Sequence, residues 1–201
     1  MTEVEPSTAF TILIVCTGNI CRSPLAEQLL RTRLTAAGVP VRVVSAGTRG
    51  MVGHGMTSEA AALSLHYGAE PTGHEAQLLT EDLIASAEVV LTATREHRSD
   101  VVSLLPRASR YTFTLNQFAR LIAASNAPAV ELAETPADTL RAYLNDIAAT
   151  RGLAPPPAHP DDDDIIDPYR RSQEIYDLAG YAIDTAVTTI TSGLTAALGK
   201  A

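Results

Sequence analysis

The chain has 201 residues, a length that fits one domain, and 46% of them are hydrophobic, which is enough to build a sizeable core. Its formal net charge is −8 and its arginines are dispersed along the sequence, so a nucleic-acid partner is not expected. It has two cysteines, no basic side chain in its first eleven residues and no apolar run of about 18 residues. These features disfavour a secreted disulfide framework and predict a cytoplasmic protein with no membrane partner.

Strands and helices are expected to alternate from residue 11 to residue 114. Short β-branched runs predict buried strands, and Gly or Pro marks the end of each helical segment. Alternation with short links predicts a single α/β domain, in which a four-stranded parallel sheet has helices on both faces. The expected strands are 11–15, 41–45, 88–92 and 111–114, and the expected helices are 57–67, 95–105 and one that begins at Ser23 (N-cap) and Pro24 and ends at Gly38.

The segment 123–163 differs in character from the rest of the domain, which is expected to span 10–198. It contains a predicted helix, 136–151, with Thr135 as its N-cap, followed by a proline-rich stretch and the acidic run 161–164. We interpret it as an insertion with a stiff exposed linker, and the acidic run as a solvated charge run. A long C-terminal helix is expected to bury a stripe of apolar residues: Ile175, Leu178, Ala182, Ala186, Ile190 and Leu194.

The chemistry is expected where the first strand ends, at Cys16, with five residues between it and Arg22. A loop of backbone N–H groups before a helix binds an oxyanion, and the same positive field favours a thiolate nucleophile. Arg22 can then bind two phosphoryl oxygens with its planar fork, and Ser23 can donate a hydrogen bond to the sulfur. The alternative is a turn around a buried structural cysteine, but the strand before the loop and the Ser-Pro start after it favour catalysis. The loop residues expected to bind phosphate are Thr17, Gly18, Asn19, Ile20, Cys21 and Ser23.

Four segments carry a family resemblance that covers most of residues 10–190 outside the insertion. They are 15–27, 45–48 (Ser-Ala-Gly-Thr), His74 with Ala76, and 167–169 (Asp-Pro-Tyr). With them the chain resembles the low-molecular-weight protein tyrosine phosphatases. The resemblance implies a four-stranded parallel sheet, a phosphocysteine intermediate, and neither a metal nor another cofactor.

Carried over residue by residue, the resemblance implies that Cys16 is the nucleophile and Arg22 the phosphate clamp. Asn19 is implied to hold a left-handed turn of the loop. The implied bonding partners of Asn19 are Ser23, Ser45 and His74. On residue type alone, His74 would instead be an ordinary surface or helix-capping histidine.

A protonated group must also assist the leaving oxygen, and Asp167 is the candidate because the rigid ring of Pro168 can fix its loop. Asp-Pro is also a common turn, and Asp164 is the alternative acid. Tyr169 is expected to line the substrate mouth or simply to pack. The family often has an aromatic residue shortly after the Ser-Ala-Gly-Thr segment, where this chain has Met51. Met51 is therefore the other candidate for the substrate mouth.

Cys21 has two readings: the family implies a reversible disulfide with Cys16, and burial as a small core thiol is equally consistent with the sequence. The substrate also stays open. A phosphorylated protein or a small aryl phosphate is expected, and Ile20 favours phosphotyrosine over phosphoarginine because a Thr commonly stands there in phosphoarginine phosphatases. Arsenate reduction would need an external small thiol, since no cysteine follows Cys21. A phosphopeptide-binding module would need neither Cys16 nor a catalytic acid, so the presence of both favours an enzyme over a binding module. The sequence specifies no oligomeric state.

Overall fold

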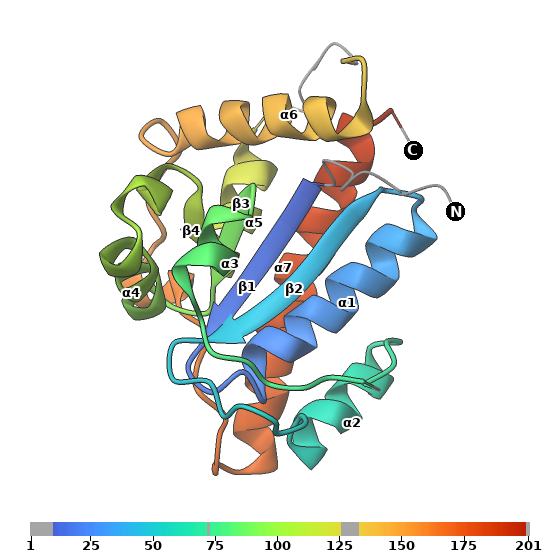
Figure 1. Ribbon diagram of the computed structural model, residues 1–201, viewed down its shortest axis with the longest axis vertical. Coiled ribbons are helices and arrows are strands. Elements are labelled where there is room, and N and C mark those ends of the chain that lie inside the picture. Colours follow the sequence, from blue (N-terminus) through green and yellow to red (C-terminus); the bar gives the residue numbers. More distant parts are fainter. Residues whose placement is uncertain (1–9, 72, 126–132, 200–201) are drawn as a thin grey trace.

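The computed structural model describes residues 10–71, 73–125 and 133–199. Its centre is a four-stranded sheet of order β2-β1-β3-β4, in which every neighbouring pair is parallel (Figure 1). The strands are β1 (Phe10–Cys16), β2 (Val41–Gly47), β3 (Val89–Thr92) and β4 (Thr112–Thr114). The predicted fold class is confirmed.

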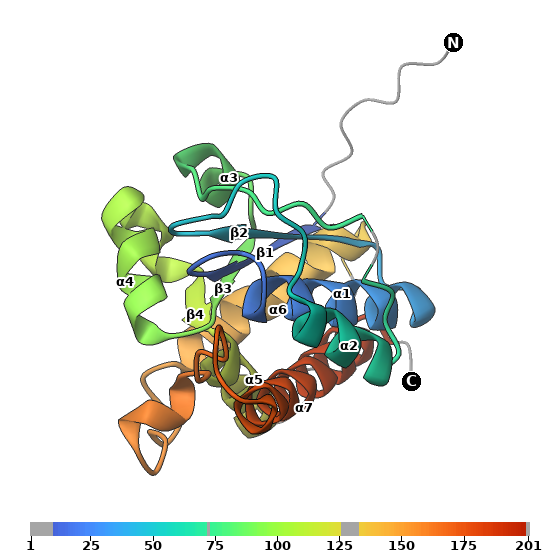
Figure 2. The same ribbon diagram turned by 90° about the horizontal axis from the view of Figure 1, so that it is seen from below.

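Helices cover both faces of this sheet, as the view along it shows (Figure 2). On the larger face lie α1 (Arg22–Ala36), α2 (Ser58–His66), α5 (Leu115–Ala124), α6 (Pro136–Thr150) and α7 (Gln173–Ala197). On the smaller face lie α3 (Glu81–Ala85), α4 (Arg95–Leu104) and the 3₁₀ helix η1 (Pro106–Arg110). A second 3₁₀ helix, η2 (Pro160–Asp163), precedes α7.

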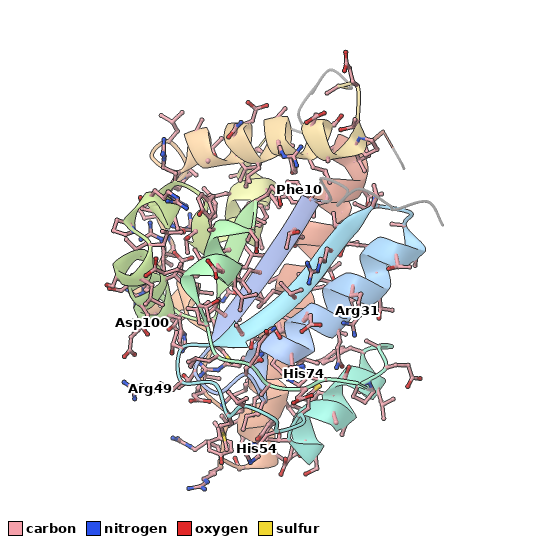
Figure 3. All side chains as sticks on the ribbon, in the orientation of Figure 1. Phe10, Arg31, Arg49, His54, His74 and Asp100 are labelled. Carbon is pink, nitrogen blue, oxygen red and sulfur yellow. The ribbon has the colours of Figure 1, made fainter. Side chains whose placement is uncertain are left out.

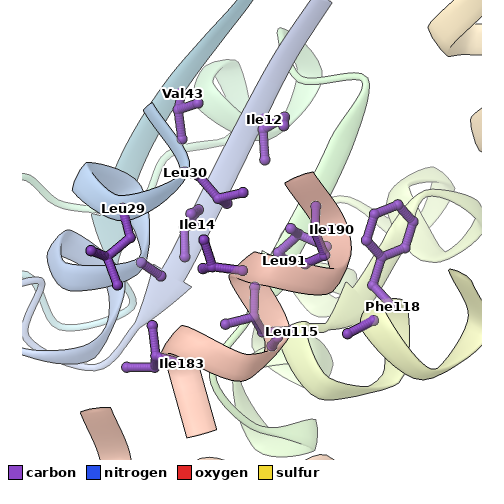
Figure 4. Packing of buried hydrophobic residues seen from close by; sticks show 14 of the residues in the cluster. Ile12, Ile14, Leu29, Leu30, Val43, Leu91, Leu115, Phe118, Ile183 and Ile190 are labelled. Carbon is purple, nitrogen blue, oxygen red and sulfur yellow. The ribbon is translucent and has the colours of Figure 1, made fainter. Parts of the chain in front are cut away.

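The alternation of side chains along β1 produces two separate cores. Ile12 and Ile14 belong to the larger cluster, whereas Leu13 and Val15 belong to the smaller one. A strand buried on both faces needs a continuous apolar run, which explains the sequence of β1. In the larger core, Ile14 and its neighbours lie among side chains of α1, α5 and α7 (Figure 4).

The C-terminal helix is confirmed, but the predicted buried stripe is wrong in its first half. Leu178 is 54% exposed, and Tyr176 and Ala179 are buried in its place. The reason is the close approach of α2, since a Cβ on Gly180 would lie only 3.1 Å from the Leu63 side chain. Small residues therefore decide which face of α7 packs, and the larger Leu178 stays outside.

One local prediction around the sheet is also wrong, and one helix was missed. Helix α1 begins at Arg22, with Cys21 rather than Ser23 as its N-cap, because the Ser23 hydroxyl contacts Asn19 and Cys16 instead. Helix α5 was not predicted, since β4 runs into it without a turn: Thr114 ends the strand and caps the helix through the N–H of Gln117.

The predicted helix at 136–151 is present as α6, with Thr135 accepting from the N–H of Asp138. Its Leu140 and Ile147 are buried in the larger core, and it lies across the amino ends of the strands (Figure 1). The prediction of a solvated acidic run holds for Asp161 and Asp162, which are exposed, and is wrong for Asp163, which is buried. Ion pairs fasten three members of the run to the domain: Asp163 with Arg120, and Asp161 and Asp164 with Arg95.

Among the helices that the structure describes, none has the length and apolar character needed to cross a bilayer.

Candidate active site

Residues 16–22 form a loop between β1 and α1 whose backbone carbonyls point outward. The carbonyls of Cys16, Thr17 and Gly18 accept from the N–H groups of residues 48, 49 and 51, at 2.9–3.0 Å. The carbonyl of Ile20 accepts from Thr57 N–H at 2.9 Å. Within the described part of the chain, the N–H groups of residues 17–21 donate to no acceptor. Five unpaired donors in one loop at a helix N-terminus form a concave site for an oxyanion.

Asn19 holds this loop in shape. It adopts φ 57°, a left-handed angle that Asn tolerates better than most residues. Its side-chain amide donates to Ser23 Oγ (2.9 Å) and Ser45 Oγ (2.7 Å), and its Oδ1 accepts from the N–H of Gln77 (2.9 Å). The structure thus places Asn19 at the centre of the predicted set of partners.

His74 and Glu27 support Asn19 from the outer side of the loop. His74 Nε2 lies 2.7 Å from the Asn19 carbonyl oxygen, and its Nδ1 lies 3.9 Å from Glu27 Oε2. Glu27 also accepts from the Ser45 hydroxyl at 2.6 Å. Figure 3 shows His74 beside the first turns of α1. Glu27 was not singled out from the sequence, although it stands in the motif that carries the family resemblance.

The Cys16 thiol lies at the floor of the loop and is 2% exposed. Its sulfur is 3.0 Å from Ser23 Oγ, and that oxygen also accepts a hydrogen bond from the Asn19 side-chain amide. When the sulfur is a thiolate it carries no proton, so Ser23 is then the donor in this contact and stabilises the negative charge.

Arg22 is buried beside the loop, and one of its three guanidinium nitrogens has no partner among the described residues. Its Nη1 donates to the Ile165 carbonyl at 3.0 Å and its Nη2 contacts Thr17 Oγ1 at 3.4 Å. Its Nε is buried and has no partner among the described residues. A buried guanidinium donor without an acceptor is costly, and a phosphoryl oxygen would supply that acceptor.

Asp167 reaches the same guanidinium from the opposite rim. Its Oδ2 lies 3.1 Å from Arg22 Nη2, and its side chain is 53% exposed. The alternative acid, Asp164, is instead gripped by Arg95, which donates to it from its backbone N–H (2.7 Å), Nε and Nη2. Of the two carboxylates, Asp167 is the one at the cavity that contains Cys16.

A cavity of about 140 Å³ opens above the cysteine. Ile20, Met51 and Tyr169 form its apolar walls, so the structure brings both predicted mouth residues to the loop. Arg49 also lines it and was not identified from the sequence. Arg49 projects outward at the end of the sheet where β1 and β2 finish (Figure 3). An apolar slot of this kind accommodates a flat ring above the bound phosphate.

His97 is a further residue that sequence reasoning missed. Its ring links the loop to α4, with Nε2 2.8 Å from Thr17 Oγ1 and Nδ1 2.7 Å from Thr94 Oγ1. Burial, and secondarily the charge of Arg22, lowers the pKa of His97 to about 4, so the ring is neutral at pH 7. No sequence motif identifies His97, because the two loop residues that act on it, Thr17 and Arg22, are far from it in the sequence.

Cys21 is a free, buried thiol, as is Cys16. Its sulfur contacts the hydroxyls of Thr57 (3.5 Å) and Tyr176 (3.6 Å), and burial raises its pKa. A raised pKa keeps Cys21 protonated and makes it a poorer nucleophile than a thiolate. The reversible disulfide remains a prediction.

A thiol beneath a ring of free N–H groups, a buried guanidinium and a carboxylic acid at the rim define a cysteine-dependent phosphatase site. Residues 11–149 match the model of the low molecular weight phosphotyrosine protein phosphatase family. The chain belongs to this family.

Individual relatives agree with this assignment. The chain is 37% identical over 108 residues to the low molecular weight protein-tyrosine-phosphatase Etp of Escherichia coli K12, which covers 54% of this chain and 70% of that one. It is 36% identical over 107 residues to the protein-arginine-phosphatase of Bacillus subtilis, covering 53% and 71%. The structure superposes on the YwlE arginine phosphatase of Geobacillus stearothermophilus with a TM-score of 0.65 and 27% identity, over 93% of this chain and 94% of that one.

Proposed function

We propose that this protein hydrolyses phosphotyrosine in protein substrates through a phosphocysteine formed on Cys16. The observation that carries the proposal is the loop 16–22, in which five backbone N–H groups and Arg22 Nε have no acceptor in the described structure. These donors are available to a phosphoryl group held above the Cys16 sulfur. They would bind most tightly the extra negative charge of the transition state.

In the first step, Cys16 Sγ attacks phosphorus as its S–P bond forms and the P–O bond to the tyrosyl ring breaks. The phosphoryl oxygens bind the loop N–H groups and Arg22, and Asp167 at the rim of the cavity serves as the protonated acid. Asp167 then donates its proton to the departing phenolate oxygen, and tyrosine leaves neutral.

In the second step, water attacks the phosphocysteine and gives its proton to the Asp167 carboxylate. The S–P bond breaks, inorganic phosphate leaves, and the electron pair returns to sulfur. The Ser23 hydroxyl, 3.0 Å from that sulfur, stabilises the returning thiolate. Atoms and charge balance without another reactant.

The apolar slot supports phosphotyrosine over phosphoarginine. Ile20, Met51 and Tyr169 offer flat apolar contact to an aromatic ring, whereas a guanidino group would need polar partners there. Phosphoarginine is the second candidate because two of the relatives described above are named arginine phosphatases. Arsenate reduction with an external thiol has no such support.

A panel of phosphotyrosine, phosphoserine and phosphoarginine peptides tests the assignment. We expect kcat/KM to be highest for phosphotyrosine, and Ile20→Thr to shift the ratio toward phosphoarginine. A wild-type protein that prefers phosphoarginine would contradict the proposed substrate while leaving the cysteine mechanism intact.

The cytoplasmic location proposed with this activity rests on the two free, buried thiols of the protein, which suit a reducing compartment.

A further inference from the structure

An open groove of about 920 Å³ is separate from the cysteine cavity and shares none of its lining residues. It is bounded by α4, η1 and the C-terminal half of α6, at the amino ends of β3 and β4, whereas the loop follows the carboxyl end of β1 (Figure 1). The arginines that appear dispersed in the sequence gather here. Five of them line what we call the arginine groove: Arg98, Arg107, Arg110, Arg141 and Arg151.

This concentration of positive charge stands out because the whole chain has a formal net charge of −8. The acidic residue in the lining is Glu88, and it is already occupied. Its carboxylate accepts from Arg141 at 3.0 Å and from the Thr11 N–H at 2.6 Å. The groove therefore has a strong excess of positive charge.

Arg98 and Arg151 are fixed side by side on the same two carbonyls. Arg98 donates to Thr112 O (3.0 Å) and Ser109 O (3.4 Å), and Arg151 donates to the same oxygens at 2.7 and 2.9 Å. The Arg151 guanidinium also lies 3.8 Å above the Phe113 ring. These contacts cover the outer edge of β4, which is a structural role, and they hold both guanidinium planes rigid.

That role leaves the two charges uncompensated. No carboxylate pairs with Arg98 or Arg151 within the described residues. Burial, and then the repulsion from Arg98, lowers the pKa of Arg151 to about 10. The Nε of Arg151 is buried without an acceptor. A bound anion would relieve this repulsion and accept from the remaining N–H groups.

Arg107 and Arg110 extend the same charge along η1. Both are exposed, and neither has an ion pair in the part of the chain that the structure describes. The opposite wall, from α6, is partly apolar: Leu144, Ala148 and Ala149 lie there beside Asn145 and Arg141. A series of cations facing a partly apolar wall suits a ligand with several linked anionic groups and, in some forms, a flat organic part.

We propose that the arginine groove binds a small molecule that carries a chain of phosphate groups, either as a free oligophosphate or as a nucleoside polyphosphate. Planar guanidinium groups match phosphate oxygens in pairs, and the volume of the groove falls in the range of small-molecule sites. A long nucleic acid fits less well, because beyond the groove the net-negative protein would repel it. The proposal is independent of the phosphatase activity.

Titration of ¹⁵N-labelled protein with sodium tripolyphosphate, followed by amide chemical shifts, tests this directly. The cysteine loop also binds phosphate in our account, and the amide signals separate the two sites. We expect saturable shifts at Arg110, Tyr111 and Ala149, independent of those at Gly18 and Asn19. A parallel titration with ATP shows whether a nucleoside adds affinity through the apolar wall.

The matched variants are Arg107→Gln with Arg110→Gln, which leave Arg98 and Arg151 in their structural places, and Arg42→Gln as a control on the exposed face of β2. The double variant should weaken binding at the groove about tenfold and the control should leave it unchanged. Shifts confined to the cysteine loop, shifts that do not saturate, or equal affinity in the double variant would overturn the proposal. So would tighter binding of a decaglutamate peptide than of tripolyphosphate, which would make the groove a site for acidic protein segments.

Discussion

At the scale of single residues, the geometry of Arg22 makes a point charge a poor substitute. Its Nη1 is committed to the Ile165 carbonyl and its Nε is the free donor, so phosphate binding uses the fork rather than charge alone. Arg22→Lys should lower kcat by about 10²-fold or more toward an aryl phosphate. Arg49→Lys, the same change at the rim, is the control and should cost little. A near-normal Arg22→Lys enzyme would show that charge suffices.

The assignment of the acid is also a residue-scale claim. Protonation of the leaving group contributes about 10²–10⁴-fold, and more for a basic leaving group. Asp167→Asn should therefore slow hydrolysis of phosphotyrosine strongly and that of p-nitrophenyl phosphate much less. If Asp164→Asn showed this dependence on the leaving group instead, the acid would be the carboxylate that Arg95 holds.

At the scale of elements, the end of β2 packs against the cysteine loop only because residue 47 is glycine. A Cβ there would collide with the Thr17 carbonyl oxygen and lie 2.8 Å from Gly50 Cα. Gly47→Ala should cost about 1–3 kcal/mol of unfolding free energy and weaken phosphate binding. Gly55→Ala is the control, since its Cβ would meet nothing closer than 3.9 Å. Equal phosphate affinity in Gly47→Ala would mean that the loop keeps its shape without this contact.

The link from α4 to the loop through His97 should make stability depend on pH. The pKa of His97 is about 4 in the folded protein, below the ordinary value of 6.5, so between these pH values the unfolded chain binds a proton that the folded protein does not. Stability should fall by about 3 kcal/mol from this group as pH drops from 6.5 to 4, and level off below. Denaturant unfolding of His97→Asn across this range should show a shallower fall than wild type. An identical fall would refute the link, and His66→Asn, at an exposed site, should behave as wild type does.

At the scale of the whole molecule, the sequence predicts what is local and misses what depends on distant segments. The strand, loop and helix around Cys16 are encoded within adjacent residues, so the fold class and the loop could be predicted. Burial of Leu178 was predicted incorrectly, because hydrophobic spacing contains no information on how closely α2 approaches Gly180. His97 and the arginine groove could not be predicted for the same reason, because the residues that form each of them lie far apart in the sequence.

The central claim is that the Cys16 sulfur itself carries the phosphoryl group. Steady-state hydrolysis of a phosphotyrosine peptide by Cys16→Ser, beside phosphate binding by the same variant, tests it most directly. We expect turnover to fall to background, while phosphate still binds with an affinity near that of wild type, because the loop donors and Arg22 remain. Substantial turnover by the folded, phosphate-binding Cys16→Ser protein would contradict the covalent mechanism.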